Sequence, residues 1–456
     1  MVRVRFAPSP TGNLHVGNGR TAVLNYLFAR HEKGRFILRI EDTDLERSQV
    51  AFEESIKTDL RWLGIDWDEG PDRQSERLDI YRNHAGMLLE RGLAYKCFCS
   101  REGLESARAD ALRRGEPPRY GQTCRNLPDG AVRALEAQGR PFVLRFKSPA
   151  KGIAFTDGIH GAMDFPAGHV DDFIIMRTDR VASYNFAAAV DDLLMGITHV
   201  IRGADHLPNT PKQIMLFLAF GKEPPAYAHH SLLLGNDRKP LSKRHGATTV
   251  AEFRALGILP EAMVNYLAII GRRTDDELMG VVRLVETFSL RSFSSSDTLF
   301  DREKLLWLNK EHMRIMPPAL LAAMMGLPET DREKVAALRE NARTLNDMRA
   351  MLAMFEGADI EEDAVIYLST LKDGHGLRAL LQGITEGDHR DFEDLFKGLE
   401  KRSALARREI LMVLRIAITG RKSGPPLKEL YRFVPKDIML KRAEWLEKRF
   451  SGPSEA

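Results

Sequence analysis

The chain has 456 residues, 43% of them hydrophobic and 29% charged, and its formal net charge is +3. This length exceeds one ordinary hydrophobic core and predicts about two to four domains. No apolar run approaches the roughly twenty residues that a membrane helix needs, and the N-terminus enters a strand too early for a signal peptide, so a cytoplasmic globular protein with no membrane partner is expected.

The N-terminal stretch predicts a strand, a loop and the start of a helix. Apolar residues alternate over 2–6, two prolines and a glycine turn the chain over 8–12, and residues 21–30 carry apolar side chains at helical spacing. His15 and Gly17 then stand near a helix N-terminus, where free N–H groups suit an anion such as a phosphate. His15 could equally cap an ordinary turn.

The next expected strand is followed by acidic residues. Residues 36–40 are typical of a buried strand, and Glu41 comes directly after its C-terminal end. Ligands of open parallel sheets gather at the carboxyl ends of strands, so Glu41 is expected to face the same crevice as His15. Asp42 and Asp44 are more typical of turn or cap residues.

Helical periodicity over 51–63 and 77–91 alternates with these strands and predicts a doubly wound α/β fold. The chain contains no Gly-x-Gly-x-x-Gly and no P-loop signature. Their absence excludes the commonest class of dehydrogenase and the P-loop class of nucleotide-binding protein.

A cysteine cluster interrupts the α/β pattern. Cys97 and Cys99 are one residue apart and Cys124 lies farther along the chain, so three thiolates could hold Zn²⁺ if Tyr120 supplies a fourth donor. The alternative is three free cysteines without a metal. Expected strands at 142–146 and 172–177 make this region a second α+β unit.

Two basic features follow. Arg202 ends an apolar strand that returns the chain to the parallel sheet, a position suited to capture of a carboxylate, although a surface ion pair is the alternative. Lys243 lies in the basic loop 239–247, and a basic loop is usually just solvated.

From residue 317 to 450 nearly every periodic stretch is helical, with breaks expected at Gly357, at Gly383 and over 423–426. Residues 401–456 hold 14 Lys/Arg against 6 Asp/Glu. A basic helical tail is a candidate phosphate-contacting surface, and also a common solvated face.

Taken together, these motifs resemble one family. His15-Val16-Gly17-Asn18 resembles the His-Ile-Gly-His signature of class I aminoacyl-tRNA synthetases, and residues 5–12 and 38–44 resemble the glutamyl-tRNA synthetase versions of the segments around it. Residues 239–244 resemble the Lys-Met-Ser-Lys-Ser loop. The resemblance to bacterial-type glutamyl-tRNA synthetases spans nearly the full chain.

The resemblance implies ligation of L-glutamate to tRNA through a glutamyl-adenylate, with ATP and Mg²⁺ as substrate. The implied catalytic residues are His15 and Lys243. Those implied to bind ATP are Gly12, His15, Gly17, Asn18, Ser242, Lys243 and Arg244. Those implied to bind glutamate are Arg5, Ala7, Ser9, Glu41, Tyr184 and Arg202. Cys97, Cys99, Tyr120 and Cys124 resemble the zinc site of some members.

The family's architecture implies a Rossmann-like doubly wound α/β catalytic domain, an inserted α+β domain for the tRNA acceptor end, and an all-α anticodon-binding region. The expected segments are 1–93 and 181–250 for the catalytic halves, 94–180 for the insertion, 251–316 for a helical stem and 317–456 for the anticodon domain. A monomer is the family default.

Three departures from the family pattern are Asn126, where some members have a zinc-binding histidine, Ala188, where many have a substrate-binding asparagine, and Pro240 in the lysine loop. They leave open a tRNA-binding or regulatory paralogue without charging activity. A short relative that glutamylates a modified tRNA base lacks the helical tail. Whether tRNA-Glu, tRNA-Gln or both are charged is open.

Overall fold

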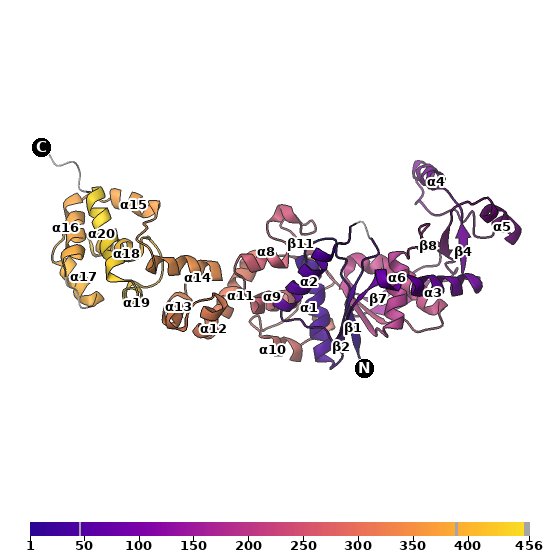
Figure 1. Ribbon diagram of the computed structural model, residues 1–456, viewed down its shortest axis with the longest axis horizontal. Coiled ribbons are helices and arrows are strands. Elements are labelled where there is room, and N and C mark those ends of the chain that lie inside the picture. Colours follow the sequence, from indigo (N-terminus) through magenta and orange to yellow (C-terminus); the bar gives the residue numbers. More distant parts are fainter. Residues whose placement is uncertain (45–46, 388–390, 451–456) are drawn as a thin grey trace. The chain divides into compact units, whose positions relative to one another are not determined.

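The computed structural model describes residues 1–44, 47–387 and 391–450. The chain forms two compact units, one of residues 1–253 and 263–301 and the other of 254–262 and 302–456. The first unit contains the sheets, and the second is built from helices (Figure 1). This composition confirms the expected α/β part followed by an all-α region.

The N-terminal sheet contains the parallel strands β1 (Arg3–Phe6), β2 (Arg35–Ile40) and β3 (Glu69–Arg73), in that order. Helix α1 (Val16–His31) connects the first two strands, and α2 (Val50–Trp62) connects β2 to β3. Helical connections between parallel strands are what the alternation of strand-like and helix-like patterns in the sequence predicts.

A second sheet has the strand order β7-β6-β10-β9. Its members are β6 (Ile153–Asp157), β7 (Gly161–Phe165), β9 (His199–Gly203) and β10 (Ala226–His230). Strands β6, β10 and β9 run parallel, and β7 is antiparallel to β6. Strands β6 and β7 were not predicted from the sequence, and β6 pairs with the distant β10. The edge of this sheet adjoins the first, because the Thr198 N–H donates to the Arg3 carbonyl at 2.9 Å.

A third, antiparallel sheet has the order β4-β5-β8, from β4 (Ala94–Cys97), β5 (Val143–Phe146) and β8 (Phe173–Met176). Two helices, α4 (Arg101–Arg113) and α5 (Asp129–Ala137), lie between its first two strands in the chain. The strands expected over 142–146 and 172–177 are therefore confirmed.

The remaining elements of the 1–301 region cover and join these sheets. They are α3 (Leu78–Glu90), α6 (Tyr184–Leu194), α7 (Thr210–Ala219), β11 (Leu233–Leu234), α8 (Val250–Ala255), α9 (Pro260–Ile269), α10 (Val281–Glu286) and β12 (Thr298–Leu299).

The C-terminal region is helical throughout the residues described. Its α-helices are α11 (Arg302–Ile315), α12 (Pro318–Met324), α13 (Arg332–Leu338), α14 (Leu345–Leu352), α15 (Glu362–Ser369), α16 (Gly374–Glu386), α17 (Phe392–Glu400), α18 (Arg407–Thr419), α19 (Leu427–Leu430) and α20 (Lys436–Phe450). Within the described chain, no helix combines the length and the apolar character needed to cross a bilayer.

The expected break at Gly383 is wrong, because this residue lies inside α16. A Cβ at Gly383 would come within 2.7 Å of a methyl carbon of Leu399, which belongs to α17. The glycine therefore lets two helices approach closely, a packing role that the sequence alone does not separate from helix breaking.

Candidate active site

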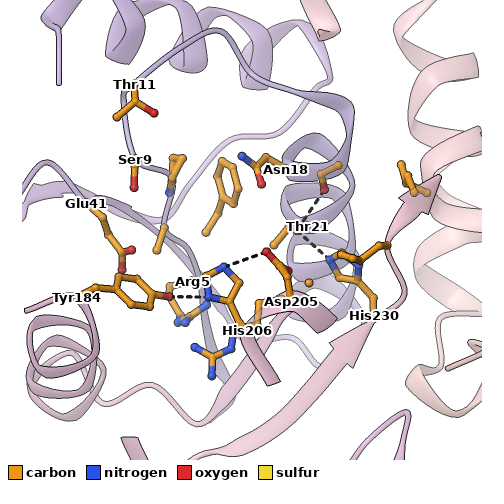
Figure 2. A pocket seen from close by; sticks show the side chains of 18 of the residues that line it. Arg5, Ser9, Thr11, Asn18, Thr21, Glu41, Tyr184, Asp205, His206 and His230 are labelled. Carbon is orange, nitrogen blue, oxygen red and sulfur yellow. Dashed lines mark hydrogen bonds and ion pairs between the residues drawn. The ribbon is translucent and has the colours of Figure 1, made fainter. Parts of the chain in front are cut away.

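A polar cavity of about 300 Å³ opens in the first unit where several parallel strands end (Figure 2). Glu41 follows β2, Arg202 lies near the end of β9, and His230 ends β10. Eight of the predicted residues line this cavity: Arg5, Ala7, Ser9, Gly17, Asn18, Glu41, Tyr184 and Arg202. The strand-end rule placed Glu41 and Arg202 here, and the resemblance implied the other six.

A buried network of charges forms one wall. Arg39 is fully buried and donates to Asp192 at 2.6 Å and to Glu41 at 2.9 Å. Arg5 donates through Nε to the same Asp192 carboxylate at 3.1 Å. The network holds two of the predicted residues, Arg5 and Glu41, in fixed orientations.

The same contacts set the protonation of the acids. Burial raises the pKa of Glu41, and Arg39 and Arg5 offset this only in part. Burial also acts on Asp192, but Arg5 and Arg39 hold the pKa of that carboxyl below its ordinary value. Asp192 therefore balances the two arginines, whereas the Glu41 carboxylate keeps capacity for a further cation.

Arg202 is 4% exposed, and one of its terminal nitrogens has no hydrogen-bond partner among the described residues. Its Nε donates to His229 Nε2 at 3.2 Å, and Nη2 donates to the Thr210 hydroxyl at 2.9 Å. Its third nitrogen, Nη1, is buried with no hydrogen-bond partner among the described residues. A buried guanidinium N–H without a partner is costly, so this atom is suited to an anionic ligand in the cavity.

Tyr184 and His206 are neighbours in the lining of the cavity, with 3.1 Å between the phenol oxygen and His206 Nδ1 (Figure 2). Burial raises the pKa of Tyr184 to about 12. Burial and the neighbouring Arg202 lower the pKa of His206 to about 4. Both groups are therefore neutral at pH 7 and act as hydrogen-bonding groups.

His15 is the N-cap of α1, and its Nδ1 accepts the Gly17 N–H at 3.2 Å. It stands beside the cavity rather than in its lining. Thr249 forms a β-bridge with His15, and the backbone of Leu241 contributes a hydrogen bond that opposes the lowering of the His15 pKa by burial. The structure thus brings the segment 241–249 against the first motif.

The lysine loop is held by one acid. Asp237 forms an ion pair with Arg244 at 3.1 Å and a hydrogen bond with His245 Nε2 at 3.0 Å. Ser242 lies against the same imidazole, with its N–H 3.0 Å from Nδ1. Lys243 begins a short 3₁₀ helix, Lys243–His245; its side chain lies outside the part of the chain that the structure describes. Gly12, Ser242 and Arg244 do not line the cavity.

Several lining residues were missed from the sequence: Thr11, Thr21, Asp205, His206, His230 and Ser231. His230 was detectable, because it ends a parallel strand as Arg202 does. Its Nε2 lies 2.8 Å from the Thr21 hydroxyl. His206 lies in a short 3₁₀ helix, Ala204–Asn209, for which no periodic signal exists.

The three cysteines converge as their spacing suggested. The Sγ atoms of Cys97, Cys99 and Cys124 all lie within 4.8 Å of one another. The Tyr120 phenol oxygen is 3.2 Å from the sulfur of Cys97 and 3.7 Å from that of Cys99. Four donor atoms in this arrangement fit a tetrahedral zinc ion, for which thiolates are the preferred ligands.

Residues 1–307 match the family model for the catalytic domain of class I tRNA synthetases (E and Q). The chain belongs to this family. Residues 303–444 match an anticodon-binding domain. The E and Q synthetase fold explains why the cavity, the α1 N-terminus and the lysine loop converge.

Relatives of this synthetase chain match it almost end to end. A glutamate–tRNA ligase 2 of Syntrophus aciditrophicus is 42% identical over 98% of this chain and 99% of its own length. A glutamate–tRNA ligase of Aquifex aeolicus is 42% identical over 97% and 98%. A crystal structure of a glutamate tRNA ligase from Elizabethkingia meningosepticum, in complex with its amino acid, matches with a TM-score of 0.84 at 30% identity, covering 99% and 100%.

Proposed function

We propose that this chain is an ATP-dependent glutamate–tRNA ligase. Relatives of that name match nearly all of its length. The observation that carries the choice of amino acid is the set of charged groups in the cavity: Arg5, Arg202 and Glu41 line it, and Asp205 lies beside His206 in the same lining. Glutamate offers two carboxylates and one ammonium, the complement of two guanidinium groups and one carboxylate.

Each predicted glutamate-binding residue then has a role. Arg202 takes the backbone carboxylate through its unpartnered Nη1. Arg5 and Tyr184 take the side-chain carboxylate, and Glu41 takes the ammonium. Ala7 and Ser9 line the same cavity and shape it around the substrate.

The reaction has two steps. A glutamate carboxylate oxygen attacks the ATP α-phosphate, and the bond to pyrophosphate breaks. A terminal tRNA hydroxyl then attacks the carbonyl of the adenylate, releasing AMP and a proton. Mg²⁺ accompanies ATP and shields its phosphates. No protein nucleophile is required, so the chain supplies positioning and charge stabilisation.

His15 and Lys243 are the proposed catalytic residues, because the first stands at a helix N-terminus and the second in the loop beside it. Gly12, Gly17, Asn18, Ser242 and Arg244 are proposed to surround ATP. We expect Lys243→Ala to slow glutamate activation about 10²–10³-fold, since it removes charge stabilisation at the leaving pyrophosphate. Glutamate binding should stay within threefold of wild type in equilibrium binding; an unchanged activation rate contradicts the role.

The segments around the cavity are assigned by the same reasoning. The region 94–180 is proposed to bind the tRNA acceptor end, and 317–456 the anticodon, with 251–316 between them as a stem. The match of an anticodon-binding model to residues 303–444 supports the second assignment. The protein is proposed to act as a cytoplasmic monomer.

Zinc is proposed to be held by Cys97, Cys99, Cys124 and Tyr120, where it would stabilise the fold around β4. Mass spectrometry of metal content tests this without activity. One zinc per chain is expected in the wild type, and less than a tenth of that in Cys99→Ser. Zinc-free wild-type protein with unchanged thermal stability contradicts the site.

The function itself is tested by charging separately prepared tRNA-Glu and tRNA-Gln with labelled glutamate and ATP. Glutamate on tRNA-Glu alone indicates a discriminating synthetase. Glutamate on both, or on tRNA-Gln alone, places the chain in an indirect route to glutaminyl-tRNA. Binding of tRNA without charging of either contradicts the proposal and favours the non-catalytic paralogue.

A further inference from the structure

Three neighbouring parallel strands end in a row of interacting side chains. Asp157 ends β6, His229 is the fourth residue of β10, and Arg202 is the fourth residue of β9. Strand β10 lies between the other two, and His229 is directly opposite Arg202 in the register. The row therefore runs across the sheet from Asp157 to the cavity.

The row is continuous and closed to water. His229 Nδ1 lies 2.6 Å from Asp157 Oδ2, and His229 Nε2 accepts from Arg202 Nε at 3.2 Å. Asp157, His229 and Arg202 are 2%, 0% and 4% exposed. Thr210 completes the arrangement, with its hydroxyl 3.0 Å from His229 Nε2 and 2.9 Å from Arg202 Nη2. Only Arg202 of the three ionisable members lines the cavity.

The contacts determine the tautomer of His229. Burial alone would raise the pKa of Asp157, but hydrogen bonds from His229 and from the backbone lower it to about 2. An ionised carboxylate can only accept, so Nδ1 carries the proton and Nε2 has a lone pair. Burial lowers the pKa of His229, which keeps the second nitrogen unprotonated. The lone pair at Nε2 takes the Nε–H of Arg202.

We propose that Asp157 and His229 are positioning residues for the substrate carboxylate: Asp157 sets the tautomer of His229, and His229 holds Arg202 in the orientation that leaves Nη1 without a protein partner and available to the carboxylate. The inference rests on the proposed function, since the ligand of Arg202 is the glutamate carboxylate. A buried arginine has several rotamers, and the pair of bonds at Nε and Nη2 selects the one that leaves Nη1 unpartnered.

The substitution Asp157→Asn tests the tautomer directly. Asp157 Oδ1 accepts from the backbone N–H groups of Ile159 and His160 at 2.9 Å and of His229 at 3.2 Å. These donors require an oxygen at that position, so the new amide nitrogen takes the place of Oδ2 and donates to His229 Nδ1. The proton then moves to Nε2, where it meets the Arg202 N–H.

We expect the KM for glutamate to rise roughly 10- to 100-fold in Asp157→Asn, with the KM for ATP within threefold of wild type, in charging assays at saturating tRNA. His229→Gln keeps an acceptor oxygen for Arg202 and an amide N–H for Asp157, so its KM should rise less than fivefold. His229→Leu has no ring nitrogen, so combining it with Asp157→Asn should cost no further affinity beyond that of His229→Leu alone. This masking separates tautomer control from general loss of packing, whose effects would add.

His229→Leu gives the matched control, since it fills space without an acceptor. Its KM for glutamate should exceed that of His229→Gln at least tenfold, a comparison that holds even when Asp157→Asn fails to fold. Equal KM values for the two His229 variants, or additive effects of Asp157→Asn and His229→Leu, overturn the inference. Wild-type protein in the same assay keeps the outcomes apart: no charging there refutes the proposed function instead.

Discussion

The cavity of the first unit and the helical core of the second both bury arginine, but they use the guanidinium differently. In the helical unit Arg442 is 1% exposed, and its terminal nitrogens donate to the carbonyls of Ile418, Met354 and Gly357. In the cavity Arg202 keeps Nη1 without a partner among the described residues. Arg442 therefore stabilises the helical unit, whereas Arg202 has a terminal nitrogen available for a ligand.

Arg20 shows that this difference depends on the hydrogen-bond partners of the guanidinium group and not on the unit in which the arginine lies. It lies in the first unit, and its terminal nitrogens donate to the carbonyls of Ser231 at 2.8 Å and Ile270 at 2.7 Å. Burial lowers the pKa of Arg20, like that of Arg442, to about 10, so both remain charged at pH 7. Among these three buried arginines, only Arg202 has a terminal nitrogen without a partner in the described residues, and Arg202 lines the cavity.

The largest expected effect is on Arg202→Met. Removing the guanidinium should lower kcat/KM for glutamate about 10³-fold, because charge-assisted bonds to a carboxylate contribute about 2–5 kcal/mol. The melting temperature should stay within about 2 °C, since the variant also removes a buried charge. Steady-state charging and calorimetry measure the two quantities. If the variant instead loses stability but keeps its glutamate KM, then Arg202 has a structural role like that of Arg442.

Arg442→Met should show the opposite pattern. The change leaves buried carbonyls without donors and should lower the free energy of unfolding of the helical unit by about 2–3 kcal/mol. Urea titration followed by circular dichroism measures this loss. The KM for glutamate at 25 °C should match wild type, and an unchanged urea midpoint would contradict the structural role.

Glu41 carries the next expected effect, and it depends on pH. Its pKa is raised by burial, so as the pH falls Glu41 becomes neutral, and stops attracting the substrate ammonium, at a higher pH than an ordinary glutamate would. The KM for glutamate should therefore rise as the pH falls. Glu41→Gln should raise it about 10- to 100-fold and remove the pH dependence.

Glu53→Gln is the matched control for that experiment. Glu53 is also buried by its neighbours, but Arg73 and Lys57 hydrogen-bond to it and hold its pKa below the ordinary value. It does not line the cavity. A glutamate KM that depends on pH equally in Glu41→Gln and in wild type would assign the titration to another group.

Local sequence patterns predicted residues that line the cavity, but they did not predict the residues that hold those side chains in place. Glu41 and Arg202 follow apolar strands, so the strand-end rule found them, and the cysteine spacing found the sulfur cluster. Asp157 was missed because β6 falls in a segment expected to be an insertion, and its place in the sheet depends on pairing with β10. Such non-local pairing leaves no periodic trace in either strand.

Side-chain networks were missed for a related reason. Arg39 stands within the apolar run of β2, where the sequence identifies no partner for its charge, and it is fully buried among carboxylates from α6. The sequence shows which residues are charged but not which charges meet. The roles of Gly12, His15, Lys243 and the other site residues stay predictions, since the fold places their backbones and not their ligands.

The smallest expected effect extends the comparison to histidines. Both ring nitrogens of His230 have partners, Nε2 with the Thr21 hydroxyl at 2.8 Å and Nδ1 with the Ser231 carbonyl at 3.1 Å. His206 uses Nδ1 for Tyr184, while its Nε2 is 3.8 Å from the nearest oxygen of Asp205, too far for a hydrogen bond. A terminal nitrogen without a hydrogen-bond partner in the described residues distinguishes Arg202 from Arg442. By the same criterion, we expect His206 to contact the substrate and His230 to stabilise the fold.

Ala188, where the family resemblance implies an asparagine, is 1% exposed and carries no polar group. His206 offers a neutral ring nitrogen in the cavity lining, and the lowering of its pKa to about 4 keeps it neutral above about pH 5. His206→Ala should therefore raise the KM for glutamate about three- to tenfold without shifting the melting temperature. His230→Ala should lower the melting temperature by several degrees, and a reversal of these two outcomes would show that unpaired ring nitrogens do not mark the substrate side of the cavity.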